Sequence, residues 1–345
     1  MVNEEGRRLH LWLGIAISIA SILAILALIE PAEVLEALRA ADAVYLLLSL
    51  PGALLFLVVR AARWRFLLNN QPTWGQTFHI QNIGYLLTYL LPFRIGDVAR
   101  VVLMGSVRPL TVTRAATTAV VERILDMLTI VTLLPFTLAQ VERLPGWLRE
   151  GALVAGFVAL AGVLILIAAA SQPARLRQLT LAVCRRVPFL DADAWGRRVE
   201  GLLQGLSTLR RPRDGLVLGL LSILVWLPVV VSYYVGVRAV GLSLTPAAAA
   251  FVVCVAALSV AAPSSPGQVG VYHFAVTVAL SEALGYPRGA AVSFAILMHA
   301  LNLVLALVLG VVGLHFTHRS FGDVVTMARQ FVGRRRRAAA VDEQV

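Results

Sequence analysis

The stretch LLPFRIGDV at residues 90–98 interrupts a long apolar segment, and the stretch AAPSSPGQVG at residues 261–270 interrupts another. In each stretch a proline stands four residues before a glycine, so each is predicted to end one helix and to start the next. The two breaks lie about half a chain length apart. Because broken helices at membrane depth persist only where they line a cavity within the protein, paired breaks in two halves indicate a transporter-type site.

The composition is that of a polytopic membrane protein. The chain is 59% hydrophobic and its mean hydropathy is +0.82, well above the values of soluble domains. The net charge is +11, and all 30 cationic side chains are arginines. The use of arginine in place of lysine is explained at least as well by a bias in codon use as by a need to bind phosphate. In a membrane protein a basic balance indicates cytoplasmic loops and anionic lipid rather than nucleic acid. Cys184 and Cys254 are widely separated and predict neither a disulfide nor a metal site.

Long apolar runs predict six membrane spans in a single transmembrane domain, residues 1–345. Their approximate bounds are 11–29, 43–59, 115–139, 151–170, 216–235 and 289–316. We expect the first run to be retained rather than cleaved as a signal peptide, because no clear cleavage site follows it. The acidic stretch around 30–42 is predicted to be an external loop, and Arg60, Arg63 and Arg65 are predicted to mark the cytoplasmic end of the second span. Both termini are then cytoplasmic and the protein lies in the cytoplasmic membrane.

The segments around the two breaks are predicted to be helical hairpins. The arms of the segment 79–104 have about 13 residues each, which is too short to cross a bilayer. We therefore expect a re-entrant hairpin there, and a second one over residues 246–284, where two full spans remain the alternative. The predicted fold is an all-α bundle of two inverted halves, 1–145 and 146–345.

A basic segment, residues 173–213, is predicted to be an insertion in the second half. Its arginines mark it as cytoplasmic, and its leucines recur at helical spacing. An interfacial amphipathic helix is the expected form. This segment either sets the membrane topology and keeps the cytoplasmic face solvated, or binds anionic lipid at the membrane surface.

Charged residues cluster around the first break. Arg94, Asp97 and Arg100 follow at i, i+3 and i+6, close to one helix face. Asp97 is near the start of the second arm, where a helix N-terminus favours anions, so Arg94 and this terminus could hold a lipid phosphate. The alternative is that Asp97 only caps the helix and pairs with an arginine.

The third predicted span carries Glu122, Arg123 and Asp126. Unpaired charges inside a membrane are costly, so these residues need partners, for which Arg94 and Arg100 are the candidates. A structural ion network and a direct role in ligand binding explain them equally well.

The second break offers neutral donors instead. They are Ser264, Ser265, Gly267, Gln268 and Gly270. His273 follows one turn into the next helix, where packing in the core and ligand binding are equally plausible roles. His299 and Asn302 on the last span are expected to form helix–helix hydrogen bonds. No catalytic set, metal-ligand spacing or cofactor motif is present in the sequence.

Three motifs, LPFRIGDVAR at 91–100, ERILD at 122–126 and PSSPGQVGV at 263–271, resemble the lysylphosphatidylglycerol synthase transmembrane region, a flippase-like integral membrane family. The resemblance covers nearly the whole chain. It implies a bundle with re-entrant helices that moves a modified phospholipid between leaflets, or that handles polyprenyl-sugar or hopanoid lipids. Matching positions are Arg94, Gly96, Asp97, Arg100, Glu122, Arg123, Asp126, Pro263, Pro266, Gly267 and Gly270.

The chain departs from the family pattern at three positions. Asp97 stands where glutamate is frequent, Gln268 where a second glycine is frequent, and His273 near a usual acidic residue. The family's full-length synthase also has an aminoacyl-transfer domain, and we expect no such transfer from this chain.

The sequence thus predicts a lipid translocase that binds a phospholipid or lipid-linked head group. The alternatives are a membrane-embedded enzyme acting on a lipid-linked substrate, or a non-catalytic partner of a separate glycosyltransferase or aminoacyltransferase. A homo-oligomer is compatible with each of them. The predicted substrate-binding residues are Arg94, Gly96, Asp97, Arg100, Glu122, Arg123, Asp126, Ser264, Ser265, Gly267, Gln268, Gly270 and His273.

Overall fold

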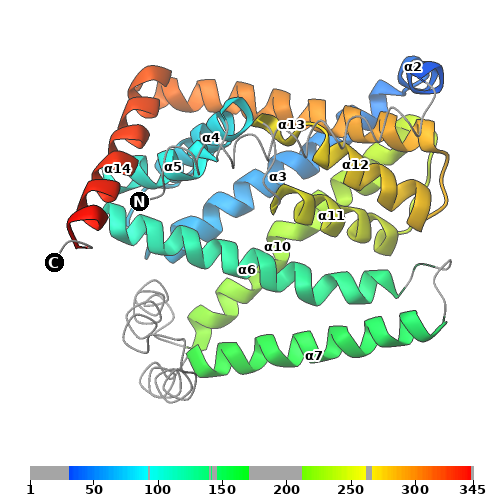
Figure 1. Ribbon diagram of the computed structural model, residues 1–345, viewed down its shortest axis with the longest axis horizontal. Helices are drawn as coiled ribbons and strands as arrows, with labels where there is room; N and C mark the ends of the chain where they lie inside the picture. The colour runs from blue at the N-terminus through cyan, green and yellow to red at the C-terminus, as the bar shows by residue number, and fades with distance from the viewer. Residues whose placement is uncertain are drawn as a thin grey trace.

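The computed structural model describes residues 31–91, 94–139, 141, 146–170, 212–261 and 266–342. The described chain is helical and contains no strand (Figure 1), which confirms the all-α prediction. Among these residues, the segments Ala43–Leu67, Arg213–Val240 and Arg288–Phe316 are long and apolar enough to cross a membrane. The predicted first span and most of the basic segment 173–213 lie outside the described residues.

The first half contains a long helix, a hairpin and a second long helix. These are α3 (Ala43–Leu67), α4 (Trp74–Leu90), α5 (Ile95–Gly105) and α6 (Val112–Leu138). Side-chain caps set three of the starts, since Asp42, Thr73 and Thr111 each accept a hydrogen bond from a backbone amide in the first turn of the helix that follows. Helix α4 ends at Leu90 and α5 begins at Ile95, so the predicted break is confirmed.

The described elements between residues 146 and 316 are again helices that flank a break. They are α7 (Gly146–Ala170), α10 (Pro212–Gly236), η1 (Val237–Val240), α11 (Pro246–Ala261), η2 (Pro266–Gln268), α12 (Val271–Val278), η3 (Ala279–Ala283) and α13 (Arg288–Phe316). The second predicted break therefore also separates two helices. Its second arm is uneven, because α12 passes into the single π-helical turn η3.

Two further segments are helical, one of them in the predicted external loop. The acidic stretch after residue 30 contains α2 (Pro31–Arg39), which packs against α13. The C-terminal tail forms α14 (Phe321–Asp342), which packs against α5 and buries Val324 and Ala328 there. The charged residues of these segments hide the apolar positions that pack on the neighbouring helices.

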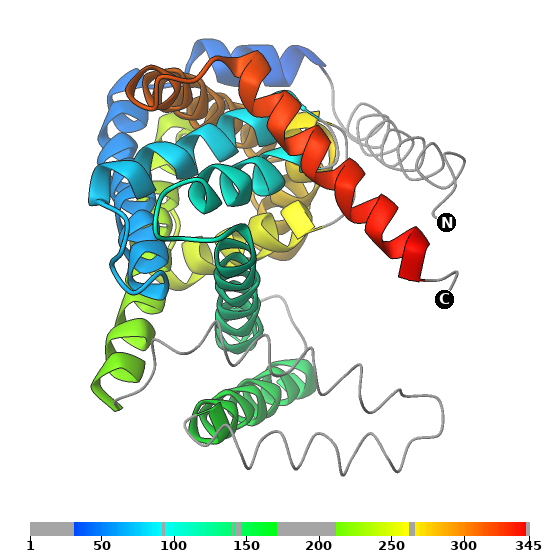
Figure 2. The same ribbon diagram turned by 90° about the vertical axis from the view of Figure 1, so that its left-hand side faces the viewer.

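The helices of the two halves pack against each other in a reciprocal pattern. Helix α3 packs along α10, α4 packs on α13, and α11 packs on α6. Within the halves, the contacts α3–α4, α4–α5 and α5–α6 correspond to α10–α11, α11–α12 and α12–α13. Helix α7 lies along α6 on the outside of the bundle (Figure 2).

Each hairpin has a core of its own. Ile83, Leu87, Val101 and Met104 are buried between α4, α5 and α14, whereas the second cluster is centred on α10 to α13. The first hairpin closes tightly, because a Cβ atom on Gly96 would overlap the carbonyl oxygen of Gly84 on α4. This approach brings the start of α5 against α4 and fixes the position of the first break.

Candidate functional site

The two breaks lie next to each other and border a cavity of about 230 Å³. The Arg94 guanidinium of the first break donates a hydrogen bond to the carbonyl oxygen of Val260 at the end of α11. At the second break, a Cβ on Gly267 would lie 3.3 Å from the carbonyl oxygen of Tyr89 at the end of α4. The two breaks are thus adjacent in space, and a cavity lies beside them.

The first half supplies every Arg, Asp and Glu side chain among the cavity-lining residues that the structure describes. We call this set the charged wall: Arg60, Arg94, Asp97, Arg100, Arg123 and Asp126. They come from α3, α5, α6 and the first break.

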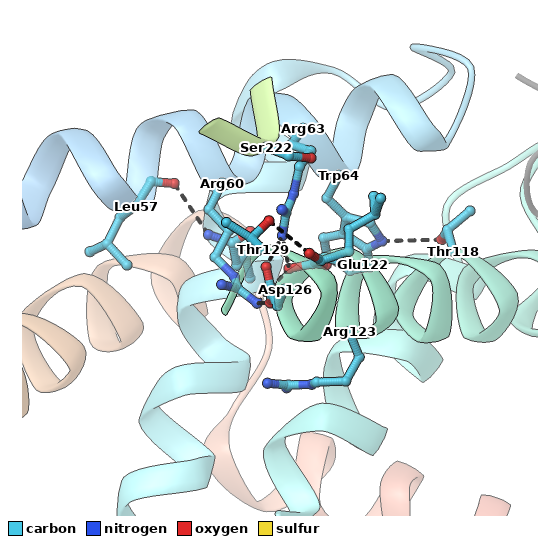
Figure 3. Close-up of polar contacts among 12 residues, drawn as sticks. Leu57, Arg60, Arg63, Trp64, Thr118, Glu122, Arg123, Asp126, Thr129 and Ser222 are labelled. Carbon is cyan, nitrogen blue, oxygen red and sulfur yellow. Dashed lines mark hydrogen bonds and ion pairs between the residues drawn. The ribbon is translucent and has the colours of Figure 1, made fainter. Parts of the chain in front are cut away.

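Three members of the charged wall belong to a buried ion network that also contains Arg63 and Glu122 and joins α3, α5 and α6. Asp126 accepts from Arg60 at 2.7 Å and from Arg63 at 2.6 Å. Glu122 lies 2.8 Å from Arg60 and 3.0 Å from Arg100. All five side chains are buried, and Figure 3 shows Arg60 and Arg63 directed at the two carboxylates from one side of α6.

The network corrects two predictions. Arg60 and Arg63 do not follow the end of the second span but lie inside its helix, because α3 continues to Leu67, and the two residues are 6% and 0% exposed. The expected pairing of Arg100 with Glu122 is present, but Asp126 pairs with α3 rather than with Arg94. Buried carboxylates take the cations that neighbouring helices offer, and the sequence did not show that α3 packs there.

Asp97 links two arginines at the more exposed side of the charged wall. Its carboxylate lies 3.4 Å from Arg100 and 3.3 Å from Arg123. The side chains of Asp97 and Arg123 are 38% and 37% exposed, and Arg123 points to the opposite side of α6 from Arg60 and Arg63 (Figure 3). Asp97 therefore pairs with arginines from its own helix and from α6.

Arg94 differs from the other arginines of the charged wall. Among the described residues no carboxylate lies within 4 Å of its guanidinium, and its hydrogen bond goes to a backbone carbonyl. Its backbone is left-handed, with φ 51°. Gln268 in the second break has φ 60° and also lines the cavity. Non-glycine residues in this region of φ are strained, and such strain concentrates at binding sites.

The second half contributes uncharged polar side chains and aromatic rings to the same cavity. We call this set the neutral wall: Trp226, Tyr233, Gln268, Tyr272, His299 and Asn302. The hydroxyls of Tyr233 and Tyr272 are 2.6 Å apart, and the His299 ring packs against those of Tyr272, Tyr89 and His273. The indole Nε1 of Trp226 is buried without a hydrogen-bond partner in the described structure.

The remaining predicted residues have other positions. Glu122 is fully buried behind the cavity, and Gly96 packs on α4. Gly270 is in a left-handed turn at φ 90°, and its amide donates to His273 Nδ1 at 3.3 Å. Ser264 and Ser265 lie outside the described residues. The Asn302 amide nitrogen donates to the carbonyl oxygen of Met298 on its own helix, not to a neighbouring helix as expected.

Several lining residues were missed from the sequence, above all Arg60, Trp226, Tyr233 and Tyr272. The apolar pattern of Trp64, Leu67 and Leu68 continues past Arg60, which could have shown that α3 extends further. The aromatic residues carry no local signal, because a tyrosine at a cavity and a tyrosine in a core have the same sequence context. Among the described residues, no cluster of three His, Cys, Asp or Glu side chains could hold a metal ion.

Comparison with known proteins places this arrangement in a family. The glycosyltransferase AglD of Haloferax volcanii is 26% identical to the chain over 347 aligned positions. The alignment covers 88% of this chain and 54% of AglD, so the chain spans about half the length of that relative. No solved structure gives a significant match. Residues 11–310 match the family model of the lysylphosphatidylglycerol synthase TM region, and the protein therefore belongs to that family.

Proposed function

We propose that the protein binds the anionic head group of a membrane lipid in its cavity and moves that lipid between leaflets. The observation that carries the proposal is the charge of the site. Five arginines, at positions 60, 63, 94, 100 and 123, face three carboxylates, Asp97, Glu122 and Asp126. A surplus of positive charge inside an apolar bundle is costly unless a ligand offsets it.

Arg94 is the proposed phosphate contact. The other arginines of the site already have carboxylate partners, whereas Arg94 has a carbonyl partner for one of its five N–H groups. A guanidinium can hold a phosphate with two parallel hydrogen bonds. Arg100 and Arg123, which share Asp97, are placed to add to the field at the same wall.

We further propose that the two halves are inverted repeats and that both hairpins are re-entrant. The reciprocal packing supports this, because exchanging α3, α4, α5 and α6 for α10, α11, α12 and α13 leaves the set of contacting pairs unchanged. A site between two such repeats can open to either side of the membrane as the repeats rock. The proposed setting is the cytoplasmic membrane, with both termini in the cytoplasm.

Lipid exchange in proteoliposomes tests the proposal. Labelled phosphatidylglycerol placed in one leaflet should reach the other faster with the protein than without it. Arg94→Ala should abolish the acceleration. Arg288→Ala should keep it, because Arg288 forms an exposed pair with Glu282 away from the cavity. Full activity in a folded Arg94→Ala protein would refute the proposed phosphate contact.

A second candidate function follows from the similarity to AglD, which is named a glycosyltransferase. The chain corresponds to about half of that protein, so it could act as the membrane partner of a separate transferase or on a lipid-linked substrate itself. The same vesicles distinguish these cases. A change in the mass of the added lipid indicates an enzyme, and movement that requires an added transferase indicates a partner.

A further inference from the structure

We infer that the bound head group carries an uncharged, hydroxyl-bearing group next to its phosphate, and that the neutral wall holds this group. The inference rests on the proposed function and names the class of its substrate. A sugar and a glycerol share this chemistry. A head group that bears an ammonium ion does not.

The first argument is the absence of charge on the neutral wall. Among the described cavity-lining residues, those after position 130 include no arginine, lysine, aspartate or glutamate. They offer instead an indole N–H, two phenol hydroxyls, an imidazole and two amides. Hydroxyl groups both donate and accept hydrogen bonds, so such a mixed set suits a polyol.

The second argument is that two buried polar atoms at the cavity have no partner in the described structure. Trp226 is 9% exposed, and its Nε1 lacks an acceptor. Gln81 on α4 is 1% exposed, and its Oε1 lacks a donor, although its amide nitrogen donates to Leu57. One atom donates and the other accepts, so a bound hydroxyl group could satisfy either. A buried polar atom without a partner calls for an explanation, and a bound group is one such explanation for an atom of a cavity-lining residue.

The third argument concerns a cationic head group. Its ammonium would need a free carboxylate, yet Asp97, Glu122 and Asp126 each lie within 4 Å of an arginine. The surplus of positive charge would also repel it. The rings of Tyr233 and Tyr272 could contact a cation, but their hydroxyls bond to each other at 2.6 Å in a site whose charged residues are mainly arginines.

Competitive lipid binding to the purified full-length protein in detergent, measured by native mass spectrometry, tests the inference. The probes have identical acyl chains: phosphatidylmethanol, phosphatidylglycerol, phosphatidylglucoside and lysylphosphatidylglycerol. Phosphatidylglycerol or phosphatidylglucoside should bind about tenfold more tightly than phosphatidylmethanol, which has the phosphate but no hydroxyl. The tighter of the two identifies glycerol or sugar as the group, and lysylphosphatidylglycerol should bind weakest.

Trp226→Phe keeps a ring but removes the N–H, and Tyr233→Phe removes one hydroxyl. Each should weaken binding of the hydroxyl-bearing lipids several-fold more than it weakens binding of phosphatidylmethanol. Trp147→Phe is the matched control, since Trp147 is 74% exposed on α7. A preference that survives both cavity variants, or tightest binding of lysylphosphatidylglycerol, overturns the inference.

The outcomes also separate this inference from the proposed function. Equal binding of the three anionic lipids, lost in Arg94→Ala, overturns the polyol inference and leaves the phosphate site intact. Absence of binding by any anionic lipid overturns both.

Discussion

The two walls of the cavity occupy corresponding places in the two halves of the chain, yet they differ in chemistry. Arg94 and Gln268 each stand two residues before a glycine in a break, each has a left-handed backbone, and each lines the cavity. One is a cation and the other an amide. The two breaks thus share a backbone conformation, whereas their side chains differ and make the cavity charged on one side and neutral on the other.

The largest expected effect on stability comes from removing a carboxylate of the buried ion network. Asp126→Ala leaves Arg60 and Arg63 without their shorter carboxylate contacts in a buried place. Removing one partner of a buried ion pair costs about 3–5 kcal/mol, so the free energy of unfolding should fall by that amount. Reversible unfolding in mixed micelles measures it.

Glu282→Ala is the control for this measurement. Glu282 pairs with Arg288, but both side chains are about half exposed, so its loss should cost about 0–1 kcal/mol. Equal effects of the two substitutions would show that the network does not stabilise the charged wall.

The next prediction makes the two breaks alike. Arg94→Gln gives the first break the amide found at the second, and should weaken binding of an anionic lipid about 10- to 100-fold, the value of one or two charge-assisted hydrogen bonds. Arg94→Lys keeps the positive charge but cannot form two parallel hydrogen bonds to a phosphate. Its affinity should therefore lie between that of the unsubstituted protein and that of Arg94→Gln. Titration with phosphatidylmethanol measures both. If Arg94→Gln binds as tightly as the parent, the phosphate lies elsewhere.

A third prediction tests what holds the first break in place. Gly96→Ala would set a methyl group against the carbonyl oxygen of Gly84, so α5 must move away from α4. Overpacking of this kind costs about 1–3 kcal/mol, and the charged wall would shift with α5. Gly219→Ala is the control, because nothing lies within 4 Å of its added methyl group. In Gly96→Ala both the unfolding temperature and the affinity for lipid should fall. In Gly219→Ala neither should fall.

The contrast between the walls also explains what the sequence could reveal. The breaks, the apolar spans that lie within 43–67, 213–240 and 288–316, and the pairing of Arg100 with Glu122 were predictable, because prolines, apolar runs and membrane charges each have a strong local cause. The role of α3 was not predictable in the same way. Arg60 and Arg63 resemble the cationic end of a span, and only the packing of α3 near α6 brings them to Glu122 and Asp126.

The neutral wall was harder still to predict. Its members come from α10, η2, α12 and α13, and they meet only because α10 to α13 share one core. Trp226 and Tyr233 lie in an apolar helix where a lipid-facing position and a cavity-facing one look alike in sequence. An uncharged site therefore gives little signal in the sequence, and its residues can be identified only once the packing of the helices is known.

The smallest expected effect concerns the hydrogen bond that fixes the neutral wall. Tyr233→Phe and Tyr272→Phe each remove one side of the 2.6 Å contact, and each should cost about 0.5–1.5 kcal/mol of unfolding free energy. The double variant should cost less than the sum of the two, because the second substitution has no bond left to break. Strict additivity would mean that the two hydroxyls act independently, and the neutral wall would then be a set of separate contacts rather than a surface positioned in advance for its ligand.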